Sequence, residues 1–193
     1  MNLRHAFCVL EERENFSQMP SIFKQWKKDQ NGSTAVEFAL IGIPFIFMVV
    51  GIIEMALMFT AQSLLEASTA EASRQIRIGA VQQGGGVDAF EDALCDFAKI
   101  IMNCDDLQYQ VESVESFQEA EDLPDASFDD EGNLENQGFD PGGVSDVVLI
   151  RIAYKYAINT PMMKYILSNQ GNSSRLLLST VVLQTEPYEF EDD

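Results

Sequence analysis

Basic residues, histidine and cysteine are scarce in this chain of 193 residues. Lys and Arg together number 12 against 31 Asp and Glu, which gives a formal net charge of −19 at pH 7. A surface this negative repels phosphates, so we exclude a nucleic-acid-binding protein and a polybasic peripheral membrane protein. Three cysteines and one histidine, His5, supply few ligands for zinc or iron–sulfur chemistry and no evident nucleophile–base set. We therefore expect no enzyme, no metal site and no cofactor.

Apolar residues, by contrast, are concentrated in one run, residues 35–61. This run of 27 residues contains only two charged side chains, Glu37 and Glu54. As a helix it would be about 40 Å long, which is enough to cross a bilayer core of about 30 Å. A buried core helix of a soluble protein, the alternative, would show a polar stripe. We predict a transmembrane helix over residues 33–61, with Glu54 near its outer end as an interfacial residue that reaches water.

The charges on the two sides of this run predict its orientation. Lys24, Lys27 and Lys28 precede it closely, whereas residues 62–193 contain 25 acidic and 7 basic residues. The positive-inside rule therefore predicts a cytoplasmic N-terminus and an extracytoplasmic remainder. The run and the segment before it are too long for a usual secretory signal peptide, and no clear A-x-A site follows.

A glycine and a glutamate flank the start of the apolar run. Gly32 is followed by four small or apolar residues and then by Glu37 and Phe38. This pattern resembles the prepilin peptidase site of type IV pilin-like proteins, in which an aspartic protease cuts after the glycine. The resemblance implies that residues 1–32 are a cytoplasmic leader. Ser33 would become the new N-terminus, with Glu37 as its fifth residue.

The resemblance covers about residues 32–190. The run STAVEFALIGIPFIFMVVGIIEMALMF and the later LLEASTAEASRQIRIG are similar to the TadE-like domain of the tight-adherence (Tad, or Flp) pilus system. Four later features also resemble TadE-type minor pilins: the runs PGGVSDVVLIRIAYKY, TPMM and SRLLLSTVVLQTEPY, and the pair Cys95 and Cys104. The resemblance implies a minor pilin or pseudopilin of a type IVb pilus, in the inner membrane of a bacterium. Its partners would be a prepilin peptidase, other Tad pilins, the inner-membrane assembly platform and the lipid bilayer.

Elementary chemistry suggests roles for the residues of this motif. Gly32 leaves a flexible backbone that can enter a protease cleft in an extended conformation. Cleavage would create an α-amino group at Ser33. That cation could pair with Glu37 of a neighbouring subunit at the membrane edge, which offsets part of the desolvation cost of the carboxylate. The alternative is that Glu37 simply reaches the aqueous interface.

The residues after the apolar run predict a small extracytoplasmic domain. We expect a helix extension and a glycine-rich linker over residues 62–86, followed by an acidic domain over 87–193. Hydrophobic periodicity predicts two helices and three strands in this domain, the helices at 87–102 and 160–167 and the strands at 107–117, 147–157 and 175–185. The predicted fold class is α+β: a long N-terminal transmembrane helix and a three-stranded, mainly antiparallel sheet.

The segment between the first two predicted strands, residues 118–146, is strongly acidic. It holds 10 acidic residues and no Lys or Arg. An EF-hand loop with Gly132 at position 6 would place Ser127 at position 1 and Gly138 at position 12, so both key ligands are missing. We expect a solvated, mobile acidic loop; a calcium site of another kind is the alternative.

Two cysteines lie in the predicted extracytoplasmic domain. Cys95 and Cys104 would meet an oxidising compartment, where a disulfide is the default, whereas Cys8 in the leader would stay reduced. One continuous helix would hold the two Cα atoms about 13 Å apart, and a disulfide needs about 7 Å or less. A bridge therefore requires the helix to break between them or the chain to fold back near Asn103. The alternative is two buried free thiols.

Two classes of function follow from these features. The resemblance favours a structural and assembly role, as a pilin-like TadE-type minor subunit required for Tad/Flp pili and surface adherence. The alternative is a single-pass membrane-anchored binding module, not cleaved after Gly32, whose ectodomain sequesters cations or a partner. The mature N-terminus distinguishes the two, because a chain that begins at Ser33 favours the first and one that retains Met1 favours the second.

Overall fold

The computed structural model describes residues 33–161, 163–169 and 173–187. The predicted leader, residues 1–32, therefore lies outside the described residues, and so do His5, Cys8 and Gly32. The chain divides into two compact units, one up to Val49 and the other from Val50 onwards.

The long helix α3 (Ser33–Arg77) begins in the first unit and ends in the second. It is the one helix among the described residues that is long and apolar enough to cross a bilayer. The most apolar stretch of 18 residues in this helix has a mean hydropathy of 2.5, and only 6% of that stretch is buried. A core helix of a soluble protein would be mostly buried, so α3 fits a single-pass membrane anchor.

The second unit contains a four-stranded mixed sheet of order β2-β1-β3-β4. Its strands are β1 (Leu107–Val114), β2 (Gly138–Phe139), β3 (Val147–Ala157) and β4 (Ser174–Gln184). The pairs β1–β3 and β3–β4 are antiparallel, whereas β2 lies parallel to β1. The three predicted strands are present and antiparallel, but the prediction of a three-stranded sheet missed a fourth, short strand that is parallel to its neighbour. Two residues are too few to give a periodic signal in the sequence.

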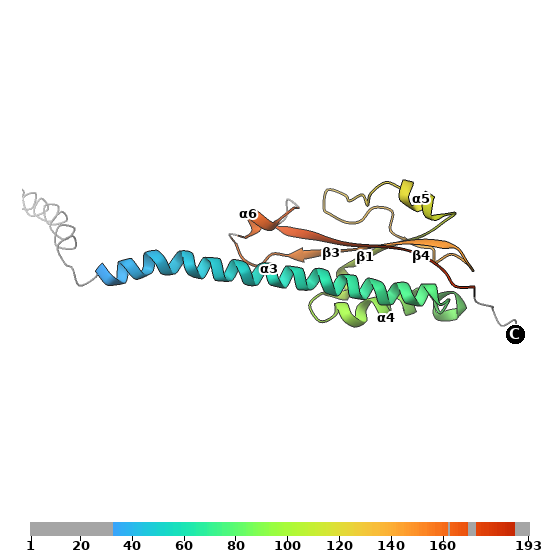
Figure 1. The fold of residues 1–193 in the computed structure, drawn as a ribbon, viewed down its shortest axis with the longest axis horizontal. Helices are drawn as coiled ribbons and strands as arrows, with labels where there is room; N and C mark the ends of the chain where they lie inside the picture. Colours follow the sequence, from blue (N-terminus) through green and yellow to red (C-terminus); the bar gives the residue numbers. More distant parts are fainter. Residues whose placement is uncertain (1–32, 162, 170–172, 188–193) are drawn as a thin grey trace, which may run out of the picture. The chain divides into compact units, whose positions relative to one another are not determined.

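One face of the sheet is covered by the second half of α3 (Figure 1). The buried side chains of α3 recur every three or four residues, so they form one face of the helix: Glu54, Met58, Ala61, Leu65, Ser68, Thr69, Ala72, Ser73 and Ile76. Hydrogen bonds tie this half of α3 to β4 and to the segment after it. The Gln62 amide donates to the carbonyl of Leu178 (3.2 Å), and the backbone N–H of Glu186 donates to the carbonyl of Arg77 (2.8 Å).

The helix α4 (Gly86–Ala98) supplies an aromatic contact to the sheet. The ring of Phe90 packs 5.3 Å from that of Tyr109 on β1 and 5.2 Å from that of Phe139 on β2. The Tyr109 hydroxyl donates a hydrogen bond to Glu91 (2.6 Å). Burial and this bond raise the pKa of Tyr109 to about 12. Phe139 thus joins β2 to the core through its side chain, although the strand itself is minimal.

The chain reverses twice around α4. Before it, the predicted glycine-rich linker forms the short π-helical segment η2 (Val81–Gly85), in which Gly84 has φ 114°, a conformation that favours glycine. A Cβ at Gly85 would lie 2.8 Å from the carbonyl oxygen of Ala80, so a side chain there would clash. The linker is therefore a close-packed turn between α3 and α4.

The other face of the sheet is covered by the segment between β1 and β3, which contains the helix α5 (Phe117–Asp122) (Figure 1). The first predicted strand ends before 117 because Ser116 caps α5, its hydroxyl accepting a hydrogen bond from the backbone N–H of Glu119 (3.2 Å). Leu134, further along the segment, is buried. As a result β3 is buried on both faces from Val147 to Ala153.

A disulfide joins Cys95 to Cys104, with Cα atoms 5.6 Å apart. The predicted bridge is confirmed, and the alternative of two free thiols is wrong. The objection from helix geometry does not apply, because α4 ends at Ala98 and the following turn brings the chain back before the 3-10 turn η3 (Cys104–Asp106). The bridge therefore closes the turn that leads from α4 into β1.

We expect Cys95→Ser to lower the free energy of unfolding of the ectodomain by about 2 kcal/mol, because the disulfide limits the unfolded chain only over a short loop. Denaturant unfolding under non-reducing conditions measures this. The wild-type pair should resist alkylation until it is reduced, and Cys8→Ser is the matched control that should leave unfolding unchanged. Labelling of both Cys95 and Cys104 in native, unreduced protein would contradict the prediction.

Candidate functional site

The predicted processing motif lies at the start of α3. Gly32 is outside the described residues, and Ser33 is the first residue of the helix. Glu37 and Phe38 follow one turn later; Glu37 is exposed and Phe38 is 78% exposed. The structure therefore places the two predicted assembly residues on a helix whose neighbouring side chains are apolar and exposed as well.

Glu54, the second carboxylate of α3, lies in a different environment. It is only 6% exposed. One of its oxygens accepts a hydrogen bond from the backbone N–H of Asn159 (3.2 Å), and the other accepts one from the hydroxyl of Thr160 (2.8 Å). The prediction that Glu54 reaches water at an interface is therefore wrong. Its carboxylate instead joins α3 to the segment that follows β3.

This connection involves the last part of β3 as well. Burial, together with the nearby charge of Glu54, raises the pKa of Tyr156. Sequence reasoning identified Thr160 only as the start of a short helix and assigned Asn159 no role. The Thr-Pro pair was a signal that this segment turns, but nothing local in the sequence pairs it with a residue more than 100 positions earlier.

The acidic segment contains a turn that is fixed to the sheet. The Asp129 carboxylate accepts hydrogen bonds from the backbone N–H (2.6 Å) and the side-chain amide (2.8 Å) of Asn133. These bonds lower the pKa of Asp129. The Asn133 side-chain oxygen in turn accepts from Gln108 on β1 (3.0 Å) and from Lys155 on β3 (2.6 Å). The turn is therefore attached to the sheet, while Asp130 and Glu131 are exposed, as expected for a solvated acidic loop.

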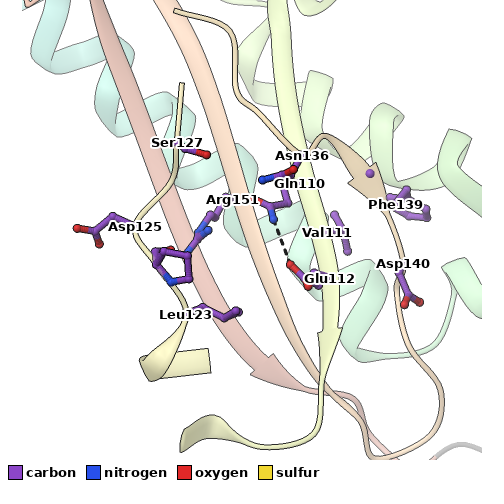
Figure 2. A pocket seen from close by; sticks show the side chains of 12 residues that line it. Gln110, Val111, Glu112, Leu123, Asp125, Ser127, Asn136, Phe139, Asp140 and Arg151 are labelled. Atoms are coloured by element: carbon purple, nitrogen blue, oxygen red, sulfur yellow. Dashed lines mark hydrogen bonds between the residues drawn. The ribbon is translucent and has the colours of Figure 1, made fainter. Parts of the chain in front are cut away.

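The same segment and the sheet enclose a hollow of about 480 Å³ (Figure 2). On its floor, buried Arg151 donates a hydrogen bond to the carbonyl of Pro124 (2.6 Å). Gln110 donates to Glu112 (3.1 Å). The bond from Arg151 to Pro124 holds the loop against β3, whereas the bond from Gln110 to Glu112 lies within β1. Among the described residues, no group of three or more His, Cys, Asp or Glu side chains is placed to hold a metal ion.

We expect Glu54→Leu to loosen the segment after β3. The substitution would leave the N–H of Asn159 and the hydroxyl of Thr160 without their acceptor, at a cost of about 1–3 kcal/mol for a buried polar group. Hydrogen exchange of the backbone amides at residues 158–168 measures the effect. Glu54→Gln keeps one oxygen acceptor at the same place and should lose less protection. Wild-type exchange in the Leu variant would show that the carboxylate does not hold this segment.

Comparison with known protein families gives a match at the N-terminal end of the described chain. Residues 32–74 match the family model described as TadE-like protein. No curated protein matches the chain, and no solved structure does. The matched segment contains Gly32, Ser33, Glu37, Phe38 and Glu54, and it ends within α3. The match confirms the resemblance drawn from the sequence: through residues 32–74 this chain is similar to the TadE-like family.

Proposed function

We propose that this protein is a membrane-anchored, pilin-like minor subunit of the TadE type, required for assembly of Tad/Flp pili and for surface adherence. One observation carries the proposal. The segment that matches the TadE-like family lies in α3, whose first part is apolar and exposed and carries a carboxylate, Glu37, four residues after the predicted new N-terminus. The proposed role is structural, because the protein would act by associating with other subunits of the pilus system.

The exposed apolar surface of α3 supports the membrane location. Large apolar side chains from Val36 to Phe59 are exposed along the helix, and they would be unfavourable in water. We infer that α3 spans the inner membrane of a bacterium with its N-terminus in the cytoplasm, in agreement with the positive-inside rule. The Cys95–Cys104 bridge supports an oxidising, periplasmic location for the second unit.

Glu37 provides a physical basis for association between anchored subunits. An ionised carboxylate among lipid-facing apolar side chains is costly, and a cation close to it lowers that cost. Cleavage after Gly32 by a prepilin peptidase would add such a cation, because it creates an α-amino group at Ser33 at the same end of the helix. Pairing between Glu37 of one subunit and Ser33 of its neighbour would set the stagger of adjacent helices. The neighbours would be other Tad pilins or the assembly platform.

We expect Gly32→Val to block processing, because a β-branched side chain hinders the extended backbone at the scissile bond. The variant should retain residues 1–32 and migrate more slowly on a gel, while wild-type protein from the membrane fraction should begin at Ser33 by N-terminal sequencing. Gly42→Val is the matched control. A Cβ at Gly42 would lie 3.7 Å from the ring of Phe38, an ordinary contact, so this variant should be processed normally.

Wild-type protein that retains Met1 would exclude the pilin-like proposal and favour a plain anchored binding module. Normal cleavage of the Gly32→Val variant would exclude Gly32 as the processing site.

We expect Glu37→Leu to separate cleavage from pilus assembly. The variant should still be inserted and largely still be cleaved, because the protease reads chiefly the glycine, but it should fail to support piliation because the Ser33 amino group loses its partner. Gel shift measures cleavage, and shearing of surface pili measures assembly. Glu66→Leu, which removes an exposed carboxylate from the same helix beyond the predicted span, is the control. Wild-type piliation with Leu at position 37 would rule out the pairing role.

A further inference from the structure

The short helix α6 (Lys164–Leu167) presents apolar side chains to the outside of the second unit. Met163 and Leu167 are buried and attach the helix to the domain. Between them, Tyr165 is 92% exposed and Ile166 is 69% exposed. An adjacent tyrosine and isoleucine that are this exposed are unusual on a soluble domain, where large apolar side chains are mostly covered.

The position of α6 along α3 is fixed by contacts within the second unit. The methyl carbon of Met163 lies 3.1 Å from the place where a Cβ on Gly51 would be. Glu54 holds the segment before α6 through Asn159 and Thr160. The helix α6 therefore lies level with residues 51–54 of α3.

Burial of one side of α3 begins at these residues, 51–54. From Gly51 onwards one side of α3 is buried, whereas residues 34–50 have no buried position. The stretch without buried positions, residues 34–50, is about 26 Å long at 1.5 Å per residue, close to the bilayer core of about 30 Å. On the uncovered side, Ile52, Ile53 and Leu57 are exposed. The exposed side chains of α6 thus lie beside the outer end of the apolar helix.

The part of the chain that includes α6 carries basic charges only. Residues 147–185 contain no Asp or Glu, although the chain has 31, and they contain four basic residues. One of these, Lys164, is on α6, and Arg175 donates a hydrogen bond to the carbonyl of Leu167 at its end (3.2 Å). The acidic helix α5 lies at the other end of the sheet (Figure 1). The acidic turn at Asp129 is held against Gln108 and Lys155 through Asn133, so the basic side chains that a phosphate surface would meet are those of Lys164 and Arg175.

We propose that α6 is a membrane-contacting element, in which Tyr165 and Ile166 enter the headgroup region of the bilayer beside α3 and Lys164 and Arg175 face the lipid phosphates. Aromatic and aliphatic side chains with flanking basic residues are the usual composition of a membrane interface. The contact gives the domain a second point of attachment and so sets its orientation on the membrane. This inference rests on the proposed membrane anchoring by α3.

Tryptophan fluorescence of the full chain tests the proposal. In a Trp26→Phe background, single tryptophans are introduced by Tyr165→Trp, by Phe45→Trp within the predicted span, and by Phe117→Trp on α5. Each variant is reconstituted in phosphatidylethanolamine–phosphatidylglycerol vesicles with plain or brominated acyl chains. We expect a blue-shifted emission and a loss of fluorescence in brominated vesicles at positions 165 and 45. Position 117, also an exposed aromatic, should emit as in water and keep its intensity.

The outcomes separate this inference from the proposed anchoring. Quenching at 45 without quenching at 165 would overturn the contact of α6 and leave the anchor intact. An emission at 165 that is blue-shifted but not quenched would assign α6 to a contact with another copy of the chain, and this would also overturn the lipid contact. If position 45 is not quenched, the anchoring itself is wrong and the inference falls with it. Far-ultraviolet circular dichroism and denaturant unfolding of each variant, compared with the wild type, verify that the ectodomain is folded.

Discussion

The second unit depends on the burial of one side of α3 from Gly51 onwards. The buried positions follow the helical repeat, and several of them are small, including Ala61, Ser68 and Ala72. Small side chains on this side allow the helix to pack against the sheet, in which Ile150 and Ile152 are fully buried. The opposite side of the same helix stays apolar and exposed up to Phe59. One continuous helix can therefore serve as anchor and as part of the domain core, because its two sides are adapted to different surroundings.

The two carboxylates of α3 illustrate this division. Glu54 is buried and its two oxygens are satisfied by Asn159 and Thr160, so its acceptors are used inside the protein. Glu37 is exposed on the part of the helix that the domain does not cover. The same helix therefore holds one carboxylate inside the domain and the other on its exposed part, where the match to the TadE-like family begins.

Charge is distributed unevenly along the chain. Acidic residues gather in the segment between β1 and β3, while the only charged residues from Val147 to Thr185 are basic. The two sets meet where Asn133, in the acidic segment, accepts hydrogen bonds from Gln108 on β1 and Lys155 on β3. The helix α6 itself contributes Lys164 and no acidic side chain, which is compatible with contact with a membrane surface rich in phosphate although the net charge of the chain is −19.

The sequence by itself determined the features that depend on local order. The apolar run of α3, the bounds of β3 at 147–157 and the motif from Gly32 to Phe38 could be recognised because periodicity and composition report neighbouring residues. The tertiary structure alone decided the parallel strand β2, the bond between Glu54 and Thr160, and the attachment of Asn133 to the sheet. Each of these joins side chains or strands that are distant along the chain. Their partners are chosen by the packing of whole elements, which no local pattern specifies.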